Sequence, residues 1–371
     1  MDKLKRFIDI LVPVTTCTLR CHYCYTTHHR LFGGPLPKFS YTPETFRKAL
    51  SQRRLGGVCM FNFCGGRETL LPPEVPEFVK ALLDEGHYVM VVTNATTDRA
   101  FDVMEKWPQE LVDRLFFKFS YHYLELKERN LFNKFFRNIK RMRDVGASFT
   151  LEATPSDELV PFIEDMKRQS KAELGAWCHV TVPRSERDMS TIPLLSNMSP
   201  DEFYNTWKVF DSPFFEYKFS VFGKKQTGFC HGGDWTMWLS MEEKTCRLCQ
   251  CYCSYFSQDI LSDINRPLSY HSVGHNCPLP HCYNAHAFLT FGTIAERNDP
   301  TYDVMRNRVC DDGTEWLKPR MKAFMSQRLR DNNEEYSAIK KFLSDMYIRR
   351  IKGTRGIRKI LSSIKRHIAC G

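Results

Sequence analysis

The chain has 371 residues, of which 42% are hydrophobic and 26% charged; this ordinary composition excludes wholesale disorder. The mean hydropathy is −0.41, and no uncharged apolar run approaches the ~20 residues that a transmembrane helix needs. The first apolar stretch contains Asp9 and leads into Cys17 without a small-residue cleavage site, so it does not indicate a signal peptide. These features predict a cytoplasmic protein without a transmembrane segment.

Charge and cysteine content are the unusual features of the composition. Lys and Arg number 53 against 43 Asp and Glu, a net charge of +10. Residues 340–371 hold ten of these cations and one acid, Asp345, so nearly all of the excess lies there. Fifteen cysteines in a chain without an export signal argue against a disulfide framework and favour thiolate–metal chemistry.

Short apolar runs alternate with longer amphipathic ones in the first two-thirds of the chain, which is typical of repeated β-α units. The predicted strands are 7–14, 58–63, 88–93, 115–120, 147–153 and 177–182. The predicted helices between them are 43–54, 74–85, 97–107, 124–145 and 156–170. The pattern predicts an α/β fold, a partial (β/α)6 TIM-like barrel, in which functional residues gather at the carboxyl ends of the strands.

After about residue 190 this alternation ends. One more helix is predicted at 198–210, with Pro200 in its first position. Residues 228–292 are rich in Cys, His, Gly and aromatics but lack periodicity, which indicates a segment held by a metal rather than by a core. Four divisions are expected: a barrel at 1–190, a last helix with its connection at 191–227, a Cys-rich domain at 228–292, and a basic helical tail at 293–371.

Three cysteines, Cys17, Cys21 and Cys24, lie within eight residues directly after the first predicted strand. A four-iron cluster normally takes four thiolates, so a loop that supplies three leaves one iron free to bind a substrate or cofactor. The alternatives are free buried thiols and a zinc site completed by a nearby histidine: His22, His28 or His29. Gaps of three and then two residues are unusual for zinc, and they favour an iron–sulfur cluster.

The Cys-x3-Cys-x2-Cys spacing, with an aromatic residue before the last cysteine, resembles the radical S-adenosylmethionine (radical SAM) superfamily. Residues 63–71 (FCGGRETLL) are similar to the Gly-rich segment of that family, which ends in Glu, and Thr93-Asn94 is similar to its Thr-Asn-Gly. The resemblance covers roughly residues 7–185. It implies a [4Fe–4S] cluster on the three cysteines whose free iron chelates SAM. Reductive cleavage of SAM then gives methionine and a 5′-deoxyadenosyl radical that abstracts hydrogen from substrate.

The same resemblance implies a set of SAM contacts. Tyr23 is expected beside the cluster and the adenine, and Gly65, Gly66 and Glu68 at the methionine amino group. Glu152 and Arg184 are candidates for the ribose and the methionine carboxylate. The further candidates lie at or just after the ends of predicted strands: Thr93, Asn94, Ser120 and His122. Arg67 stands where related segments often have Gly; it either contacts the methionine carboxylate or points to solvent.

A second cysteine region holds seven cysteines: Cys230, Cys246, Cys249, Cys251, Cys253, Cys277 and Cys282. It resembles the auxiliary-cluster domains called Twitch or SPASM. One auxiliary [4Fe–4S] cluster is implied rather than two, because the later cysteines, Cys310 and Cys370, are isolated. The implied ligands are Cys230, Cys277, Cys282 and one cysteine of the 246–253 run. Cys251 is favoured because Cys251-Tyr252 resembles a Cys-Tyr pair of related domains, while Cys249 and Cys253 stay open.

A zinc site and a wholly structural cluster are alternatives to an auxiliary cluster that transfers electrons. The aromatic pieces at 235–238 and 288–291 are expected to pack around this site. Cys59, Cys64 and Cys178 are expected to be small buried hydrophobic residues.

The resulting functional hypothesis is a radical SAM enzyme that acts on a sugar or small molecule, since no peptide-recognition domain precedes the first predicted strand. A peptide or protein maturase and a non-catalytic iron–sulfur sensor are the alternatives. A reductant such as flavodoxin or ferredoxin is the expected partner, and nucleic acid is not expected. The basic tail is either a solvated helix or a docking element for an anionic partner. The spacing of Ile360, Ile364 and Ile368 predicts one apolar face that packs on the protein's own body.

Overall fold

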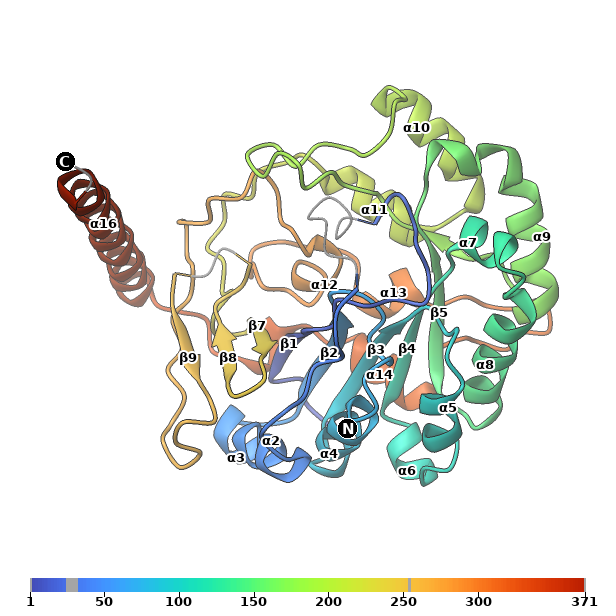
Figure 1. The fold of residues 1–371 in the computed structure, drawn as a ribbon, viewed down its shortest axis with the longest axis horizontal. Helices are drawn as coiled ribbons and strands as arrows, with labels where there is room; N and C mark the ends of the chain where they lie inside the picture. The colour runs from blue at the N-terminus through green and yellow to red at the C-terminus, as the bar shows by residue number, and fades with distance from the viewer. Residues whose placement is uncertain (1, 25–32, 253–254, 370–371) are drawn as a thin grey trace.

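The computed structural model describes residues 2–24, 33–252 and 255–369, with side chains up to residue 353. Nine strands of this described chain form one sheet, in the order β6-β5-β4-β3-β2-β1-β7-β8-β9 (Figure 1). The strands are β1 (Arg6–Val12), β2 (Cys59–Gly65), β3 (Tyr88–Thr93), β4 (Leu115–Ser120), β5 (Ser148–Ala153), β6 (His179–Val180), β7 (Thr236–Met241), β8 (Cys246–Cys249) and β9 (Ser257–Asp259).

Strands β1 to β6 pair in sequence order and are all parallel, which brings their carboxyl ends to one edge of the sheet. The predicted α/β fold with a mostly parallel sheet is confirmed. The predicted strand 115–120 coincides with β4. Strand β6 is much shorter than the predicted 177–182, because its partner β5 ends at Ala153, opposite Val180.

Helices follow most strands and cover the outer face of the sheet. Several predicted helices are split: residues 43–54 form two helices that meet at Ser51, and residues 124–145 form two that meet at Asn130, which adopts a left-handed φ of 54°. The helices up to residue 174 are α2 (Pro43–Ala49), α3 (Gln52–Leu55), α4 (Val75–Asp84), α5 (Arg99–Met104), α6 (Gln109–Val112), α7 (Tyr123–Glu128), α8 (Phe132–Asp144), the 3-10 helix η1 (Asp157–Phe162) and α9 (Ile163–Leu174).

The second half of the chain adds helices on the other side of the sheet and at its margin. The first of them, α10, begins with a capping box: the Ser199 side chain accepts from Glu202 N, and the Glu202 carboxylate accepts from Ser199 N. These helices are α10 (Pro200–Trp207), the 3-10 helix η2 (Lys208–Phe210), α11 (Pro213–Val221), α12 (Ala285–Phe288), α13 (Tyr302–Arg306), α14 (Pro319–Met325), α15 (Leu329–Asn332) and α16 (Ala338–Ala369).

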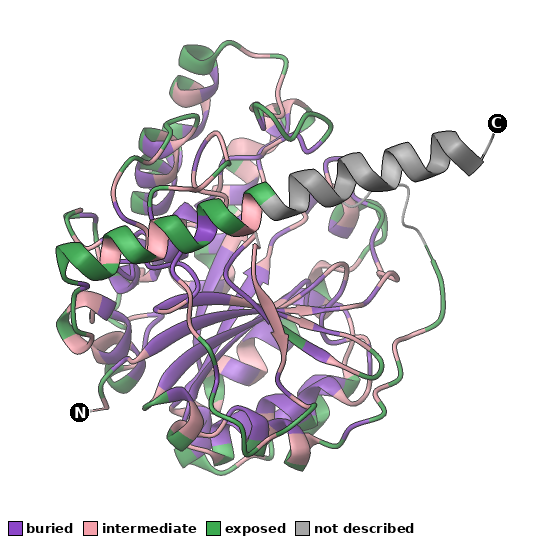
Figure 2. Ribbon diagram, turned by 90° about the vertical axis from the view of Figure 1, so that its left-hand side faces the viewer, coloured by how far each residue is buried: buried purple, intermediate pink, exposed green. Residues whose placement is uncertain are grey.

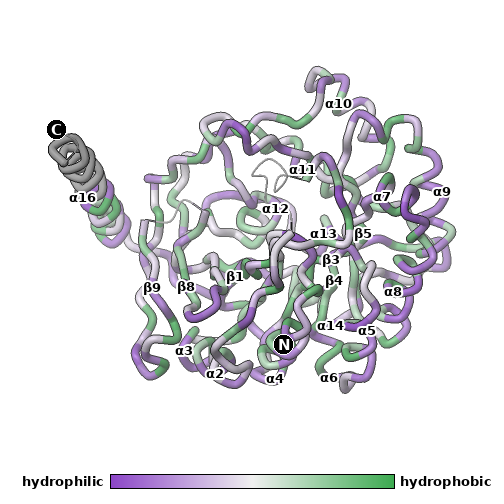
Figure 3. Tube along the Cα trace, viewed as in Figure 1, coloured by the Kyte–Doolittle hydropathy of each residue, from purple (hydrophilic) through white to green (hydrophobic). Residues whose placement is uncertain are grey.

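Both faces of the central strands are buried, which explains their nearly continuous apolar sequences. Figure 3 shows hydrophobic strands inside and mainly hydrophilic helices, such as α8, outside. On the inner face the core includes residues far along the chain: Phe7 stacks on Phe291 at 5.1 Å between ring centroids, and Tyr88 on Phe324 at 3.6 Å. Residues 285–329 therefore belong to the main core rather than to a tail that begins at 293.

Strand β7 is the largest difference from the predicted layout. Residues 228–292 were expected to be held by a metal rather than by a core, yet Thr236–Met241 pairs in parallel with β1, from Phe7↔Thr236 to Leu11↔Ser240. Strands β8 and β9 continue the sheet in antiparallel order. The Cys-rich segment is thus partly built into the central sheet, and hydrogen bonding to β1 supplies the order that its sequence pattern does not reveal.

Candidate active site

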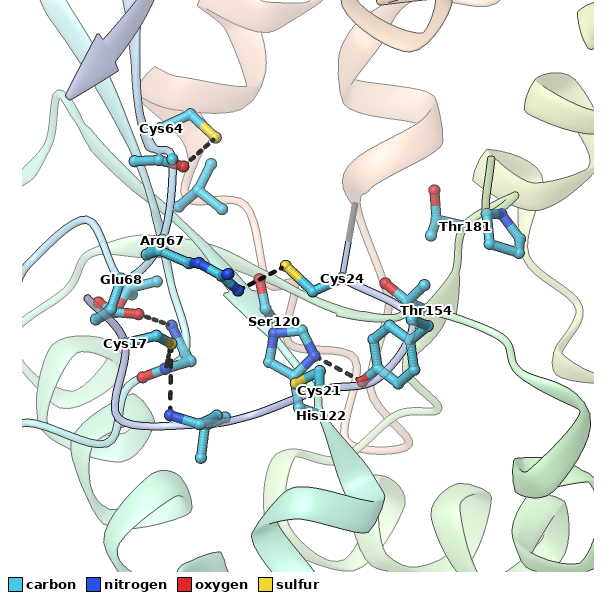
Figure 4. Close-up of a pocket in the computed structure, with 18 of the residues that line it drawn as sticks. Cys17, Cys21, Cys24, Cys64, Arg67, Glu68, Ser120, His122, Thr154 and Thr181 are labelled. Atoms are coloured by element: carbon cyan, nitrogen blue, oxygen red, sulfur yellow. Dashed lines mark hydrogen bonds between the residues drawn. The ribbon is translucent and has the colours of Figure 1, made fainter. Parts of the chain in front are cut away.

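A cavity of about 270 Å³ lies over the carboxyl ends of the parallel strands (Figure 4). Cys17, Cys21 and Cys24, in the loop after β1, all line it. Burial raises the pKa of the Cys17 and Cys21 thiols, so they need a positive partner to be thiolates at neutral pH. The structure therefore brings the three predicted ligands to one place, where the negative charge of their thiolate forms would need a positive partner.

Nitrogen donors point at two of these sulfur atoms. Cys17 Sγ accepts from Leu19 N at 3.4 Å and from Asn94 Nδ2 at 3.5 Å. Cys24 Sγ accepts from Arg67 Nη1 at 3.5 Å, so Arg67 is directed into the cavity (Figure 4). Hydrogen bonds to sulfur help to set the potential of an iron–sulfur cluster. The donors and thiols fit such a cluster. Among the described residues, no three His, Cys, Asp or Glu side chains are placed to hold a single metal ion.

The carboxylate of Glu68 is buried and connects the Gly-rich segment to the end of β3. It accepts from Thr93 Oγ1 at 2.6 Å, from Asn94 N at 2.8 Å and from Leu70 N at 3.1 Å. Burial raises its pKa, although these hydrogen bonds act in the opposite direction. Glu68, Thr93 and Asn94 all line the cavity, as predicted, and Glu68 also braces the loop.

Gly65 and Gly66 line the cavity where backbone segments come close together. A Cβ on Gly65 would lie 2.8 Å from both the Arg67 carbonyl oxygen and Val14 Cγ1, and one on Gly66 would lie 3.0 Å from the Val14 carbonyl oxygen. Contacts under 3.0 Å do not occur for real Cβ atoms, so Gly65 cannot be replaced without a backbone shift. The glycines allow the loops after β1 and β2 to pack against each other beside the three cysteines.

Tyr23 and His122 form a buried pair at the side of the cavity. The Tyr23 hydroxyl and His122 Nδ1 are 2.7 Å apart, and both residues line the cavity with Ser120 at the end of β4. Burial lowers the pKa of His122 to about 4, so the ring is neutral at physiological pH. A neutral ring and a fixed hydroxyl make this wall polar but uncharged.

Glu152 and Arg184, the candidates for ribose and carboxylate contacts, differ in their position relative to the cavity. Glu152 is not among the residues that line the cavity; its carboxylate forms an ion pair with the buried Arg306 of α13. Arg184 does line the cavity, but its guanidinium lies 3.5 Å from the Tyr283 ring centroid and donates to the Tyr283 carbonyl at 3.1 Å. Arg184 thus connects the cavity to the second cysteine region.

Among the lining residues that were not predicted, three carry a hydroxyl or an amino group: Lys218, Thr181 and Thr154. Thr154 and Thr181 directly follow β5 and β6, and the strand-end rule could have found them. Lys218 lies on α11, and its Nζ donates to Thr181 Oγ1 at 2.5 Å. Burial, together with nearby Arg184, lowers its pKa, and within the described chain it has no ion-pair partner. No sequence signal marks this lysine.

The second cysteine region surrounds a separate cavity. Four cysteines line it, which are those favoured as auxiliary ligands: Cys230, Cys251, Cys277 and Cys282. Cys246 and Cys249 lie in β8 and do not line it, and Cys253 is outside the described residues. Burial raises the pKa of Cys282 to about 12, and the Cys277 thiol adds to this rise. The arrangement is that of four thiols around one space.

The mostly parallel sheet and the cavity at its strand ends define an α/β protein with a candidate site at the carboxyl edge of the strands. Residues 11–154 match the family model described as the radical SAM superfamily. The likeness to this family covers less than half of the chain, and it implies radical chemistry with a [4Fe–4S] cluster and SAM. No curated protein sequence matches the chain.

Solved structures with a similar fold include Streptococcus suis SuiB bound to S-adenosylmethionine, with 13% identity, a TM-score of 0.47, and coverage of 71% of this chain and 64% of that one. Native anSMEcpe with bound AdoMet is similar at 14% identity and a TM-score of 0.47, over 69% of this chain and 79% of that one. The chain thus spans less than two thirds of the length of SuiB in the first structure.

We expect Glu68→Gln to weaken SAM binding by ~10- to 150-fold, because a charge-assisted contact contributes ~1.5–3 kcal/mol. The structure adds a second expected effect. In the variant, the side-chain NH2 group of the glutamine would face a backbone N–H group that now donates to the Glu68 carboxylate. Two donors cannot form a hydrogen bond, so the free energy of unfolding should fall as well. Isothermal titration with SAM and urea unfolding measure the two effects, and Glu77→Gln, on the exposed face of α4, is the matched control. Lower stability with unchanged SAM affinity would show that Glu68 is only a brace.

Proposed function

We propose that the protein cleaves SAM reductively at a [4Fe–4S] cluster held by Cys17, Cys21 and Cys24, and abstracts a hydrogen atom from a sugar or small-molecule substrate. The observation that carries this proposal is the single cavity, which unites these thiols with the polar ends of β2, β3 and β4. When bound, the cluster supplies the electron that converts SAM into methionine and a 5′-deoxyadenosyl radical.

The chain's own residues position the reactants and limit access of water. Gly65 and Gly66 keep the loops after β1 and β2 in close contact, and the Glu68 carboxylate is the group suited to the methionine ammonium. Tyr23 and His122 close one side of the cavity with a neutral wall. Asn94 and Arg67 donate to the thiolate sulfur atoms, which restricts the geometry of the loop that holds them.

The lining of the cavity supports a small polar substrate. Beyond the cysteine loop the cavity wall is formed by Lys218, Thr181 and Arg184, whose donors suit hydroxyl or anionic groups. A peptide or protein substrate is the alternative.

An auxiliary [4Fe–4S] cluster at Cys230, Cys251, Cys277 and Cys282 is part of the proposal. Support comes from the shared cavity and from the backbone N–H of Gly232, which donates to Cys230 Sγ at 3.4 Å. A reductant such as flavodoxin or ferredoxin would deliver electrons to the protein. Because Arg184 contacts Tyr283, the residue after Cys282, the two sites share a wall.

The test separates the two cysteine sets. We expect anaerobically reconstituted protein with dithionite to convert SAM into 5′-deoxyadenosine without substrate, measured by liquid chromatography. Cys230→Ala combined with Cys282→Ala should retain about four of eight irons and keep this uncoupled cleavage, because the SAM cavity holds the other set. Absence of any 5′-deoxyadenosine from the wild type would instead support the non-catalytic sensor, and zinc at 230–282 would refute the auxiliary cluster.

A further inference from the structure

Helix α16 contacts the body of the protein through its polar side. Asp345 accepts from His275 N at 3.0 Å and from Asn276 Nδ2 at 2.9 Å, and Ser344 Oγ donates to the Ser272 carbonyl at 3.0 Å. Gly274, at a φ of +62°, leaves room for this approach, since a Cβ there would collide with the Asp345 carboxylate. The docking is thus specific and fixes which side of the helix faces inward.

The same side of α16 carries further contacts one turn apart. Ile348 is completely buried, Lys341 forms an ion pair with Glu335 at 2.8 Å, and Lys352 Nζ donates to the Asn276 carbonyl at 2.7 Å. The inward residues 341, 345, 348 and 352 follow the three- and four-residue spacing of one helix face. Polar and charged groups therefore make most of the contact with the body.

The opposite side of α16 is apolar and faces outward. Ile339, Phe342, Leu343 and Met346 are 74%, 62%, 60% and 47% exposed. Their spacing of three, four and seven residues is that of a single apolar stripe, which ordinarily faces a protein core. Figure 2 shows the described turns of the helix as largely exposed. In residues 338–353 the apolar face thus points away from the body.

The outward part of this helix carries positive charge. Residues 338–353 contain five cations; Lys341 and Lys352 are on the inward side with the one acid, Asp345, and the other three are Lys340, Arg349 and Arg350. Further along, the sequence has Ile357, Ile360, Leu361 and Ile364, each 18 residues, or five helical turns, after a member of the stripe. The side chains from 354 onward lie outside the described residues, so the predicted packing of Ile360, Ile364 and Ile368 is untested.

We infer that the outward face of α16 binds the surface of an anionic lipid bilayer. An apolar stripe bordered by Lys and Arg is the pattern of a helix that lies in the interface, with its apolar side in the lipid and its cations at the headgroups. No helix of the described chain is long and apolar enough to cross a bilayer. A second copy of this chain is a poorer occupant, because it would bring an equally basic helix to the same face.

The experiment measures cosedimentation of the full-length reconstituted protein with two kinds of vesicle, phosphatidylcholine alone and phosphatidylcholine mixed with phosphatidylglycerol. We expect binding to the mixed vesicles that weakens as salt is raised. Phe342→Ser combined with Leu343→Ser should weaken it by about 100-fold, roughly tenfold for each lost side chain. Arg349→Gln should weaken it about fivefold.

Matched controls remove the same kinds of side chain elsewhere. Val304→Ser with Val309→Ser takes away two exposed apolar residues, and Lys106→Gln takes away an exposed cation; both should bind like the wild type. Because residues 342 and 343 are exposed, the melting temperature of their variant should stay unchanged. The inference is overturned if the wild type ignores the mixed vesicles, or if the Phe342/Leu343 variant binds them equally well. It is also overturned if that variant only converts a dimer into a monomer in sedimentation.

Discussion

Replacement of Cys17, Cys21 and Cys24 together by Ala is expected to halve the iron content of the reconstituted protein, from about eight to about four atoms per chain. It should also abolish SAM cleavage, because the three thiols line the cavity where SAM is proposed to bind, while the second set of cysteines lies in another cavity. Iron analysis and 5′-deoxyadenosine formation measure the two effects.

Cys64→Ala is the matched control for this triple variant. Cys64 lines the same cavity, but it is not a proposed ligand, and its thiol donates weakly to the Gly65 carbonyl at 3.8 Å. This variant should keep about eight irons and its cleavage activity. Full iron content in the triple variant would show that the loop after β1 holds no cluster.

Arg306→Met is expected to lower the free energy of unfolding by ~3–5 kcal/mol, the typical cost of removing one partner from a buried ion pair. Arg306 is completely buried, pairs with Glu152 of β5 and lies 3.9 Å from the centroid of the Phe214 ring. Burial alone would raise the pKa of Glu152, but Arg306, with Lys118 next, lowers it below its ordinary value. Without Arg306 the carboxylate becomes a poorly compensated buried charge.

The loss should depend on pH. In the wild type, a lowered Glu152 pKa contributes stability that is present above the usual pKa of a glutamate, about 4.3, and is lost as pH falls through the folded value. In Arg306→Met that pKa rises, so the variant should lose stability as pH increases above about 4.3. Urea unfolding at several pH values measures this. The added change Glu152→Gln should recover part of the loss; if it recovers none, the ion pair is not the cause.

The strand ends could be predicted from sequence because parallel strands deliver their carboxyl ends to one edge. Ser120, Thr93 and Asn94 reach the cavity for this reason alone. Glu152 was placed there by the same rule, yet the cavity is lined by Thr154, two residues further on. The difference depends on Arg306, which is 154 residues away in the chain and has no sequence feature that connects it with β5.

Lys218 and β7 could not be predicted for a related reason. The position of Lys218 depends on how α11 docks against the end of β6, and no local pattern encodes that docking. In β7 the short strand is bordered by Gly, Cys and Trp, and its pairing with β1 arises between segments more than 220 residues apart. By contrast, the four auxiliary cysteines were chosen by motif resemblance, and the fold places them around one cavity.

The position of β7 has a consequence for any shortened form of the protein. A chain cut before residue 228 would contain β1 to β6 and the cavity at their carboxyl ends, but it would lack β7, which pairs with the other side of β1. The N–H and C=O groups of β1 on that side would then form an open, apolar sheet edge, which readily pairs with other chains and promotes aggregation. The strands before residue 228 and the Cys-rich segment are therefore expected to form a single folding unit, although their cysteines line two separate cavities.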